Sequence, residues 1–387
     1  MLTRITNINI IENGRIFPGA IDMEDGKIVA VHETTPATAA DTVIDGKGFY
    51  ACPGFVDIHV HGGGNIDFMG ADPDQVKTAV AAHAKCGTTT ILPTTVTANL
   101  EMTETMIKNV RTAAESCNIT IAGVHLEGPF LSPAQAGAQD PEALTNPSAE
   151  VLDRLEQAWP GGIRIMGVAP ELPGGVAFGN VLQSRGIRAT IAHSDADYSV
   201  CVDALNNGYS DITHIYSGCS MVHRVNGYRF GGVVEAGLVE DGFTVQIIAD
   251  GKHLPAELLK LIFKCKGAER ISLITDALFP AGADLPDGSV LTQANGMQTI
   301  LEDGVMKMPH RQAFAGSIAT MDRLVRNMVN LAGVSIPDAV TMATATPARI
   351  AGLDHRKGSL KPGYDADIVL LCKDLQVQQV FAMGNML

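Results

Sequence analysis

The chain has 387 residues and a formal net charge of −14, from 28 basic and 42 acidic side chains. Hydrophobic residues make up 46% of it and charged residues 18%, so the chain can bury a large core and is not expected to be disordered. The acidic balance argues against binding to nucleic acid or to an anionic membrane surface, because both require a basic face.

The first fifty residues read as short strands without a helical period. Dipeptides typical of tight hairpin turns separate these strands at Asn13-Gly14, Asp25-Gly26 and Asp45-Gly46. The stretch from Lys361 to Leu387 has the same character. We therefore predict a small β-sandwich domain built from both termini, residues 1–51 and 355–387. The second domain, 52–354, would be inserted between them.

Within the inserted segment, short apolar runs alternate with helical stretches. Eight runs bounded by Gly, Pro or Asp predict buried parallel strands, at 55–61, 88–96, 119–127, 163–169, 188–193, 211–216, 244–250 and 270–276. Eight such units predict a (β/α)8 barrel of the TIM type. A doubly wound open sheet is the alternative, but no GxGxxG motif opens a helix. Residues 285–312 predict a β-excursion after the eighth strand, and residues 319–333 predict the last helix.

Six side chains that bind metals or transfer protons close these apolar runs. They are His59, His61, Glu127, His193, His214 and Asp276. In a (β/α)8 barrel the carboxyl ends of the strands meet at one face, where the active site lies. Residues about 200 positions apart would then surround one ion. The pattern predicts a metal-dependent hydrolase.

The spacing and surroundings of these residues indicate what each contributes. His59 and His61 are two residues apart, so both imidazoles project from one strand face and can share a divalent ion; two satisfied surface histidines are the alternative. A carboxylate such as Glu127 in an apolar run would be costly to bury without a cation. Asp276 is suited to act as general base and acid. His253 follows the seventh strand and can donate to a substrate carbonyl, or simply begin a helix.

The seven cysteines are scattered, odd in number and never form a CxxC pair, which favours a reducing compartment. The N-terminal residues lack the apolar core of a signal peptide. No run approaches the roughly 18–20 apolar residues of a membrane helix. We therefore expect a cytoplasmic protein without a membrane partner.

The motifs PGFVDIHVHG, GVHLEGPF, AGAQ, IAHSDA, THIYS, IIADGKH, LITDA, FAGS and PGYDADIVLL follow one another along the chain. In this order they resemble the N-acetylglucosamine-6-phosphate deacetylases, a family of the amidohydrolase superfamily. The resemblance implies a homodimer that removes the N-acetyl group from an amino-sugar 6-phosphate, releasing acetate and the free amine. N-acetylglucosamine 6-phosphate would be the expected substrate. It also implies one or two divalent ions per subunit, with Zn, Fe and Mn all open.

The resemblance also assigns roles by position. Glu127, His193 and His214 would bind the main ion, and His59 and His61 would bind a second one. Asp276 would take a proton from the attacking water and return it to the leaving amine, while His253 would polarise the acetyl carbonyl. The sugar pocket would include Ala138 and Phe314.

The segment after His214 departs from the family pattern. Ser217 and Gly218 stand where the family has Asn and Ala, and an Arg-Glu-Pro-Gly turn that meets the phosphate is missing. Arg224 is the nearest candidate phosphate ligand, with a solvated loop charge as the alternative. The motifs therefore indicate the chemistry more directly than they indicate the substrate.

Two rival hypotheses remain. An amidohydrolase for another N-acyl amino sugar, an N-acyl amino acid or a cyclic amide is the first, although many of those carry a carboxylated Lys on strand four and IRIMGVAPE has none. A non-catalytic sugar-binding relative is the second, but it should have lost Asp276 or a metal ligand.

Overall fold

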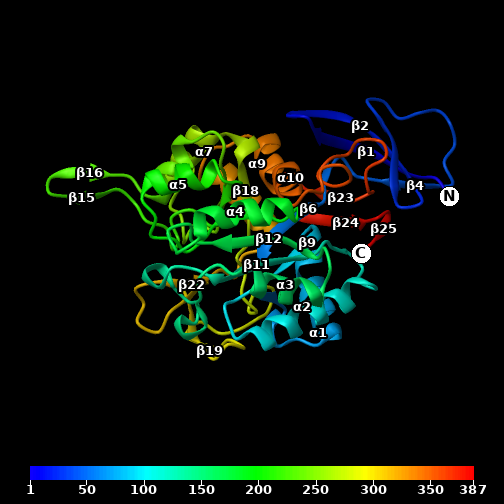
Figure 1. The fold of residues 1–387 in the computed structure, drawn as a ribbon. Helices are drawn as coiled ribbons and strands as arrows, with labels where there is room; N and C mark the ends of the chain where they lie inside the picture. Colours follow the sequence, from blue (N-terminus) through cyan, green and yellow to red (C-terminus); the bar gives the residue numbers. More distant parts are fainter.

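The computed structural model describes the whole chain, from Met1 to Leu387. Its centre is a barrel of parallel strands (Figure 1). In barrel order these are β6 (Phe55–Val60), β9 (Thr88–Thr95), β11 (Val124–Phe130), β12 (Ile163–Val168), β13 (Arg188–Ile191), β14 (Tyr209–Ile212), β17 (Thr244–Ile247) and β18 (Ile271–Leu273). The barrel closes where the N–H of Asp276 donates to the carbonyl of His59 at 2.9 Å. The predicted (β/α)8 barrel is confirmed.

The third barrel strand differs from its prediction. The run 119–127 is divided into a short β10 (Thr120–Ile121) and β11, so Glu127 lies within a strand and not at its end. Gly123, between the two, has φ of 140°, and a Cβ there would lie 2.3 Å from the carbonyl oxygen of Gly162. This tight approach interrupts the run, which composition alone did not indicate.

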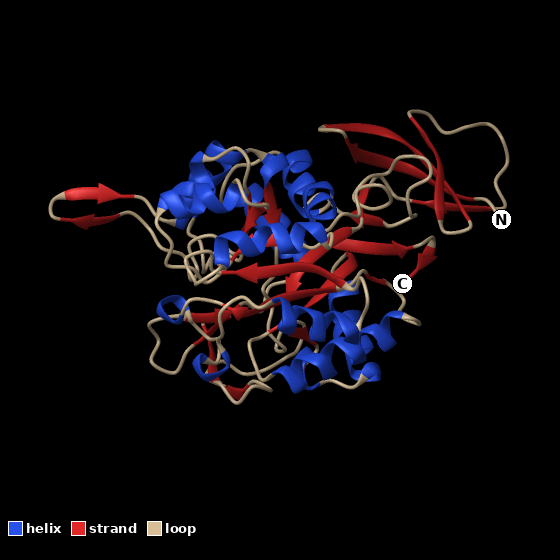
Figure 2. Ribbon diagram, viewed as in Figure 1, coloured by secondary structure: helices blue, strands red, loops and turns tan.

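Helices surround the barrel (Figure 2). They are α1 (Pro73–Ala84), α2 (Leu100–Ala114), α3 (Ala149–Ala158), α4 (Gly175–Ser184), α5 (Tyr198–Leu205), α6 (Val233–Val239), α7 (Ala256–Lys266), α8 (Met321–Asn330), α9 (Ile336–Ala343) and α10 (Ala345–Ile350). The prediction that 319–333 supplies the last helix is wrong, because α9 and α10 follow it. Pro337 lies in the first turn of α9, where a missing N–H costs nothing, so this proline starts a helix.

The inside of the barrel is filled at one end. Branched aliphatic side chains from several strands, among them Val56, Ile58, Leu92 and Ile165, form a buried cluster there with residues of α10 and the turn after it. This end is therefore packed solid. Polar and titratable side chains can gather only at the opposite end, where the strands finish.

The two chain termini form one sheet beside the barrel (Figure 1). Its strands are β1 (Thr3–Glu12), β2 (Arg15–Glu24), β3 (Lys27–His32), β4 (Thr42–Asp45), β5 (Tyr50–Pro53), β23 (Ile368–Leu371), β24 (Val377–Ala382) and β25 (Asn385–Met386). Both ends contribute to its core, with residues such as Ile5, Ile21 and Phe381. The predicted fold class, a barrel with a small β-sandwich domain built from both termini, is confirmed, and the boundaries 1–51 and 355–387 stay a prediction.

Two of the three predicted turns have the expected geometry. Asn13-Gly14 and Asp25-Gly26 both adopt left-handed φ values, between 50° and 76°, which match the twist of the flanking strands. The third left-handed pair is Lys47-Gly48 and not Asp45-Gly46. The strands flanking this turn, β4 and β5, both pair in parallel with β1 and form no hairpin.

A buried cation ties the C-terminal segment to the barrel. Nζ of Lys357 lies 2.9 Å from a carboxylate oxygen of Asp365, 2.6 Å from one of Asp367 and 2.7 Å from the hydroxyl of Thr120. The Lys357 side chain is 1% exposed. Its ammonium group therefore balances carboxylates that have little access to water.

Replacing Lys357 with methionine should lower the free energy of unfolding by about 3–5 kcal/mol, because Asp367 would be left buried without a cation. Urea denaturation of the two proteins measures this. Lys77→Met is the matched control, since Lys77 pairs with a largely exposed Asp74 and should change stability by less than about 1 kcal/mol. An equal loss of unfolding free energy in the two variants would contradict the role of Lys357 as the cation that balances buried carboxylates.

Two further β-elements lie outside the barrel sheet. Residues after β18 form a sheet of β19 (Val290–Thr292), β20 (Gln298–Glu302), β21 (Val305–Lys307) and β22 (Phe314–Gly316), which confirms the predicted β-excursion. A hairpin of β15 (His223–Val225) and β16 (Tyr228–Phe230) projects away from the body (Figure 1).

None of the helices has the length and apolar character that spanning a membrane would demand.

Candidate functional site

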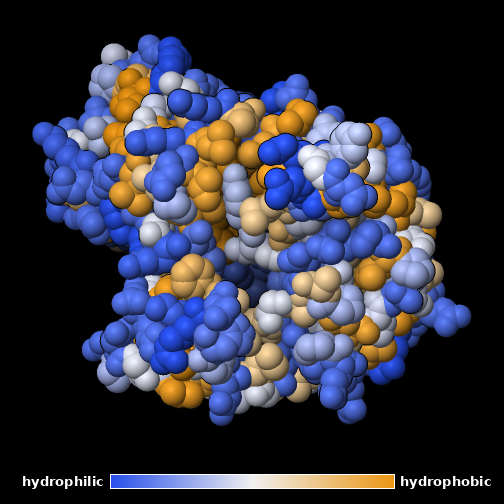
Figure 3. Space-filling view, turned by 90° about the vertical axis from the view of Figure 1, so that its left-hand side faces the viewer, coloured by the Kyte–Doolittle hydropathy of each residue, from blue (hydrophilic) through white to orange (hydrophobic).

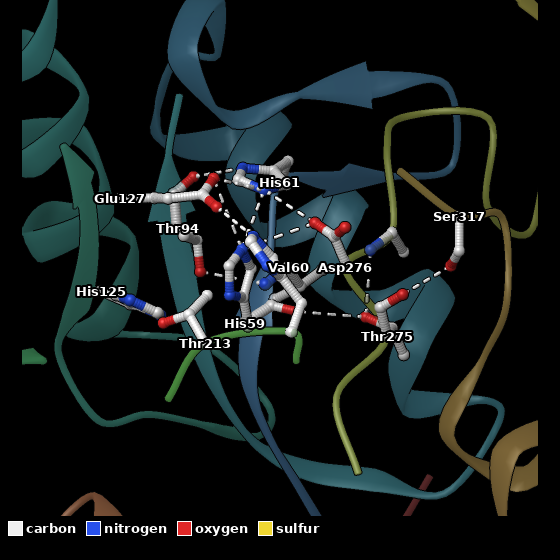
Figure 4. Close-up of polar contacts among 12 residues, drawn as sticks. His59, Val60, His61, Thr94, His125, Glu127, Thr213, Thr275, Asp276 and Ser317 are labelled. Carbon is white, nitrogen blue, oxygen red and sulfur yellow. Dashed lines mark hydrogen bonds and ion pairs between the residues drawn. The ribbon is translucent and has the colours of Figure 1, made fainter. Parts of the chain in front are cut away.

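Four side chains from three strands meet at the open end of the barrel (Figure 4). The Nε2 atoms of His59 and His61 lie 3.1 Å apart. One carboxylate oxygen of Glu127 lies 3.3 Å from Nε2 of His61 and 3.6 Å from that of His59. An oxygen of Asp276 lies 3.0 Å from Nε2 of His61. Residues separated by more than 200 positions in sequence are thus within contact distance.

Two more histidines complete the cluster from the next strands. The other carboxylate oxygen of Glu127 lies 3.1 Å from Nε2 of His193 and 2.7 Å from Nε2 of His214. All six predicted side chains are therefore brought together, and all are buried. Glu127 is at the centre of the arrangement, since its two oxygens contact four imidazoles.

The outer ring nitrogens fix how these imidazoles point. Nδ1 of His193 lies 2.7 Å from the carbonyl oxygen of Gln135, and Nδ1 of His214 lies 3.0 Å from that of Ser217. Nδ1 of His61 lies 3.3 Å from the carbonyl oxygen of Thr94. A carbonyl only accepts, so each Nδ1 carries a proton and Nε2 is the ring nitrogen that faces the centre of the cluster.

The donor atoms fit a divalent cation. His59, His61 and Asp276 form one set of mutually close ligand atoms, and His59, Glu127 and His214 form another, with all atoms of a set within 4.8 Å of one another. Imidazole nitrogen with carboxylate oxygen is a donor set that Zn, Fe and Mn all accept. The cluster can therefore hold a metal ion, and the shared His59 joins the two sets.

The electrostatics of the cluster favour a positive charge at its centre. Burial opposes ionisation of Glu127, but the surrounding imidazoles of His59, His193 and His214 hold the pKa of its carboxyl well below the usual value. Burial acts against protonation of His61, yet hydrogen bonds to Asp276 and Glu127 raise its pKa to about 10. Two ionised carboxylates thus face one another across the site.

Backbone conformation aims three of these side chains inward. The strands β13, β14 and β18 end at Ile191, Ile212 and Leu273, and the functional residues follow two or three positions later. His193, His214 and Asp276 have φ values of 43°, 25° and 46°. Left-handed φ at non-glycine residues costs of order 1–3 kcal/mol each and is typical of functional sites. The chain turns sharply here, directing each side chain to the barrel axis.

His125 lies behind the cluster and belongs to neither ligand set. Its Nδ1 is 3.0 Å from the carbonyl oxygen of Ile58, and its ring packs edge-on against His59 with centroids 4.7 Å apart. Burial, with His59 beside it, lowers the pKa of His125 well below its usual value. The neutral ring of His125 therefore packs against His59 and helps to hold it in place.

A cavity of about 260 Å³ opens above the cluster. Its lining includes the predicted pocket residues Ala138, Ser217, Gly218, His253 and Phe314, together with His61, Glu127, His193, His214 and Asp276. Figure 3, viewed from the side that carries the β15–β16 hairpin, shows a hollow near the centre of this face. Residues predicted for the metal cluster and for the sugar pocket therefore line the same cavity, and their roles stay a prediction.

The lining contains no lysine or arginine. Arg224 lies on β15, in the exposed hairpin, and is not among the lining residues. Its role as a phosphate ligand therefore stays a prediction. Gly218, at the position where the family has Ala, packs directly against the site: a Cβ there would lie 2.7 Å from Nδ1 of His193.

His253 is held by a buried carboxylate. Nδ1 of His253 lies 2.8 Å from an oxygen of Asp250, and the other oxygen of Asp250 accepts from the backbone N–H groups of Lys252 and His253. Burial opposes ionisation of Asp250, but the contact with His253 keeps its pKa below the usual value. Nε2 of His253 is therefore the ring nitrogen available to a substrate.

Sequence reasoning missed three polar residues around the site. Asp250 is the first, and it could have been noticed in the motif IIADGKH. Gln139 is the second: its Nε2 donates to Glu127 at 2.8 Å while its Oε1 accepts from the N–H of Thr97 at 2.7 Å. Gln293, in the cavity lining, is the third. It carried no sequence signal, because it lies in the β-excursion far from any motif.

Known proteins resemble this chain over nearly its whole length. The model of the Amidohydrolase family matches residues 50–387. The chain belongs to the amidohydrolase family. It is 33% identical over 380 residues to an N-acetylgalactosamine-6-phosphate deacetylase of Escherichia coli O157:H7, covering 97% of this chain and 96% of the relative. It is 32% identical over 387 residues to an N-acetylglucosamine-6-phosphate deacetylase of Bacillus subtilis, covering 97% and 94%.

Solved structures agree as well. The chain superposes with a TM-score of 0.90 and 30% identity on a mutant of N-acetyl-D-glucosamine-6-phosphate deacetylase from Mycobacterium smegmatis, in complex with N-acetyl-D-glucosamine-6-phosphate. The match covers 100% of this chain and 98% of that one. The family resemblance predicted from the motifs is confirmed: this amidohydrolase groups with the N-acetylglucosamine-6-phosphate deacetylases, hydrolases that act on amides.

Proposed function

We propose that this protein removes the N-acetyl group from an amino-sugar 6-phosphate, with N-acetylglucosamine 6-phosphate as the first candidate, to give acetate and the free amino sugar phosphate. The observation that carries the proposal is the cluster around Glu127 at the floor of a cavity. Full-length relatives and a solved structure that bear the same activity in their names support it.

In this proposal Glu127, His193 and His214 hold the main divalent ion, while His59 and His61 bind a second one. The metal could be Zn, Fe or Mn, because the donor set accepts all three. Such an ion lowers the pKa of a water molecule and polarises an acyl oxygen. Gln139 supports the arrangement by donating to the Glu127 oxygen that also contacts His59 and His61.

Asp276 serves as the proton carrier. Its carboxylate is buried beside His61 and lines the cavity, where it would face both the attacking water and the scissile amide of a bound substrate. Burial acts against its ionisation, but the contact with His61 keeps the pKa of Asp276 below the usual value. An ionised carboxylate can accept the proton of the water and return it to the leaving nitrogen.

His253 orients the acyl oxygen. Nδ1 of His253 contacts the carboxylate of Asp250, and this contact orients the ring so that Nε2 is the nitrogen presented to that oxygen. Phe314 packs against the His253 ring, with centroids 4.8 Å apart, and limits its rotation. Ala138, Ser217 and Gly218 then shape the wall against which the sugar lies.

Purified protein loaded with metal should release acetate rapidly from N-acetylglucosamine 6-phosphate. The galacto epimer is a second candidate, because one relative is named for N-acetylgalactosamine 6-phosphate. Both phosphorylated epimers and both unphosphorylated sugars should therefore be assayed together. A protein that holds metal but hydrolyses none of the four would contradict the proposed substrate class. Equal rates with and without phosphate would contradict a role for Arg224 in phosphate binding.

We also propose a cytoplasmic homodimer. All seven cysteines are free, as expected in a reducing compartment. Exposed apolar side chains gather on and beside the projecting hairpin, among them Met221, Val222, Tyr228 and Phe230. Such a patch favours burial against another protein surface, and a second copy of the chain would cover it.

A further inference from the structure

Gln293 is a buried polar residue whose side chain has an unused hydrogen-bond donor. The residue is 4% exposed and lines the cavity above the cluster. Its Nε2 atom is inaccessible to solvent and has no hydrogen-bond partner in the protein. An amide donor left unpaired in a protein interior is unfavourable, so the folded chain alone does not explain why Gln occupies this position.

The backbone around Gln293 is fixed on both sides. Its N–H donates to the carbonyl of Met297 at 2.9 Å, and its carbonyl accepts from the N–H of Gly296 at 2.9 Å. The N–H of Ala294 donates to the half-buried carboxylate of Asp67 at 2.9 Å. Asp67 lies on β8 (Ile66–Asp67), which pairs with β7 (Gly62–Gly63) directly after His61. The loop that carries Gln293 is therefore tied to the strand end that carries His61.

We propose that Gln293 is a substrate-binding residue that recognises a ring hydroxyl of the sugar. This inference rests on the proposed function and identifies a contact that decides specificity in the same cavity. A neutral side-chain amide offers a donor and an acceptor side by side. A sugar hydroxyl is also both donor and acceptor, so it can pair with either end of the amide that turns toward the cavity.

The other polar groups of an amino-sugar phosphate match the amide less well. A phosphate oxygen or an acyl oxygen only accepts, and would leave the oxygen of Gln293 without a partner. The acyl oxygen is assigned to the metal site and to His253. A ring hydroxyl is therefore the partner that the chemistry of Gln293 selects, and hydroxyl orientation is what distinguishes sugar epimers.

The test is Gln293→Leu, which removes both polar atoms and keeps a similar volume. We expect kcat/KM for the preferred N-acetylhexosamine 6-phosphate to fall about 10–100-fold. Thermal stability should be unchanged or higher, because the free protein loses an unpaired buried donor and no internal hydrogen bond. Gln298→Leu is the matched control: it makes the same change at an exposed position of the same hairpin and should leave kcat/KM unaltered.

Deoxy analogues separate substrate contact from a structural role. The unsubstituted protein should lose a similar factor, about 10–100-fold in kcat/KM, on one of the 3-deoxy and 4-deoxy substrates, and Gln293→Leu should show no further loss on that one. Equal losses on every analogue, or no loss at all, would overturn the proposal. Gln293→Met, which also removes both polar atoms, takes the place of Gln293→Leu in this comparison if the leucine variant folds poorly.

Calorimetry distinguishes failure of this inference from failure of the proposed function. N-acetylglucosamine 6-phosphate should bind at least about tenfold more weakly to Gln293→Leu than to the unsubstituted protein, whether or not the latter turns it over. Tighter binding by the unsubstituted protein without turnover would support Gln293 and contradict the deacetylase assignment. Equal affinity, or no binding to either protein, would overturn the role of Gln293.

Discussion

Asp276→Asn should lower kcat about 10²–10⁴-fold while leaving the amount of bound metal largely unchanged, as expected if Glu127, His193 and His214 are the main ligands. The amide of asparagine cannot accept the proton of the attacking water, so the step that Asp276 serves is removed. Asparagine also tolerates the left-handed backbone at this position, where φ is 46°, so the turn after β18 should be preserved. Steady-state kinetics and elemental analysis of metal content measure the two effects.

The control for this variant is Asp203→Asn, the same change at an exposed position of α5. It should leave both activity and metal content unchanged. Full activity of Asp276→Asn would exclude its role as proton carrier. Loss of activity together with loss of all bound metal would instead identify Asp276 as a ligand essential for holding the ion.

Glu127→Gln should have the largest effect on metal binding. The two oxygens of Glu127 contact His59, His61, His193 and His214, so its charge would compensate that of a cation bound at the centre of the cluster. Residues that merely support ligands typically contribute about 10–100-fold to metal affinity, and a direct ligand should contribute at least as much. Activity should fall to the level set by the residual metal.

The loss of metal binding in Glu127→Gln can be measured without any substrate. Adding Zn or Mn to the chelated, unsubstituted protein should raise its melting temperature, because an ion that binds only the folded state stabilises it. Glu127→Gln should show little of this shift at the same metal concentration. Glu142→Gln alters an exposed carboxylate and should behave as the unsubstituted protein does. An undiminished shift in Glu127→Gln would contradict its assignment as the central ligand.

The metal and proton-transfer candidates could be recognised in the sequence because of how a parallel barrel is built. Its strands are buried on both faces, so they appear as short apolar runs, and a histidine or carboxylate interrupting or following such a run stands out. The barrel then places the carboxyl ends of all strands at one face. His193, His214 and Asp276 could be found in this way, and the turns at Asn13-Gly14 and Asp25-Gly26 followed from local conformational preference.

The sequence by itself thus determined the fold class, the family and the side chains that meet at the cluster, because these depend on local patterns repeated along the chain. Tertiary structure alone decided which contacts complete the site. Glu127 lies inside β11 because Gly123 interrupts the run before it, and Asp250 supports His253 only through the turn between them. Gln293 reaches the cavity because its loop is bonded to Asp67, more than 200 positions earlier in the chain. Such long-range contacts have no local pattern, so folding must bring the residues together before they can be recognised.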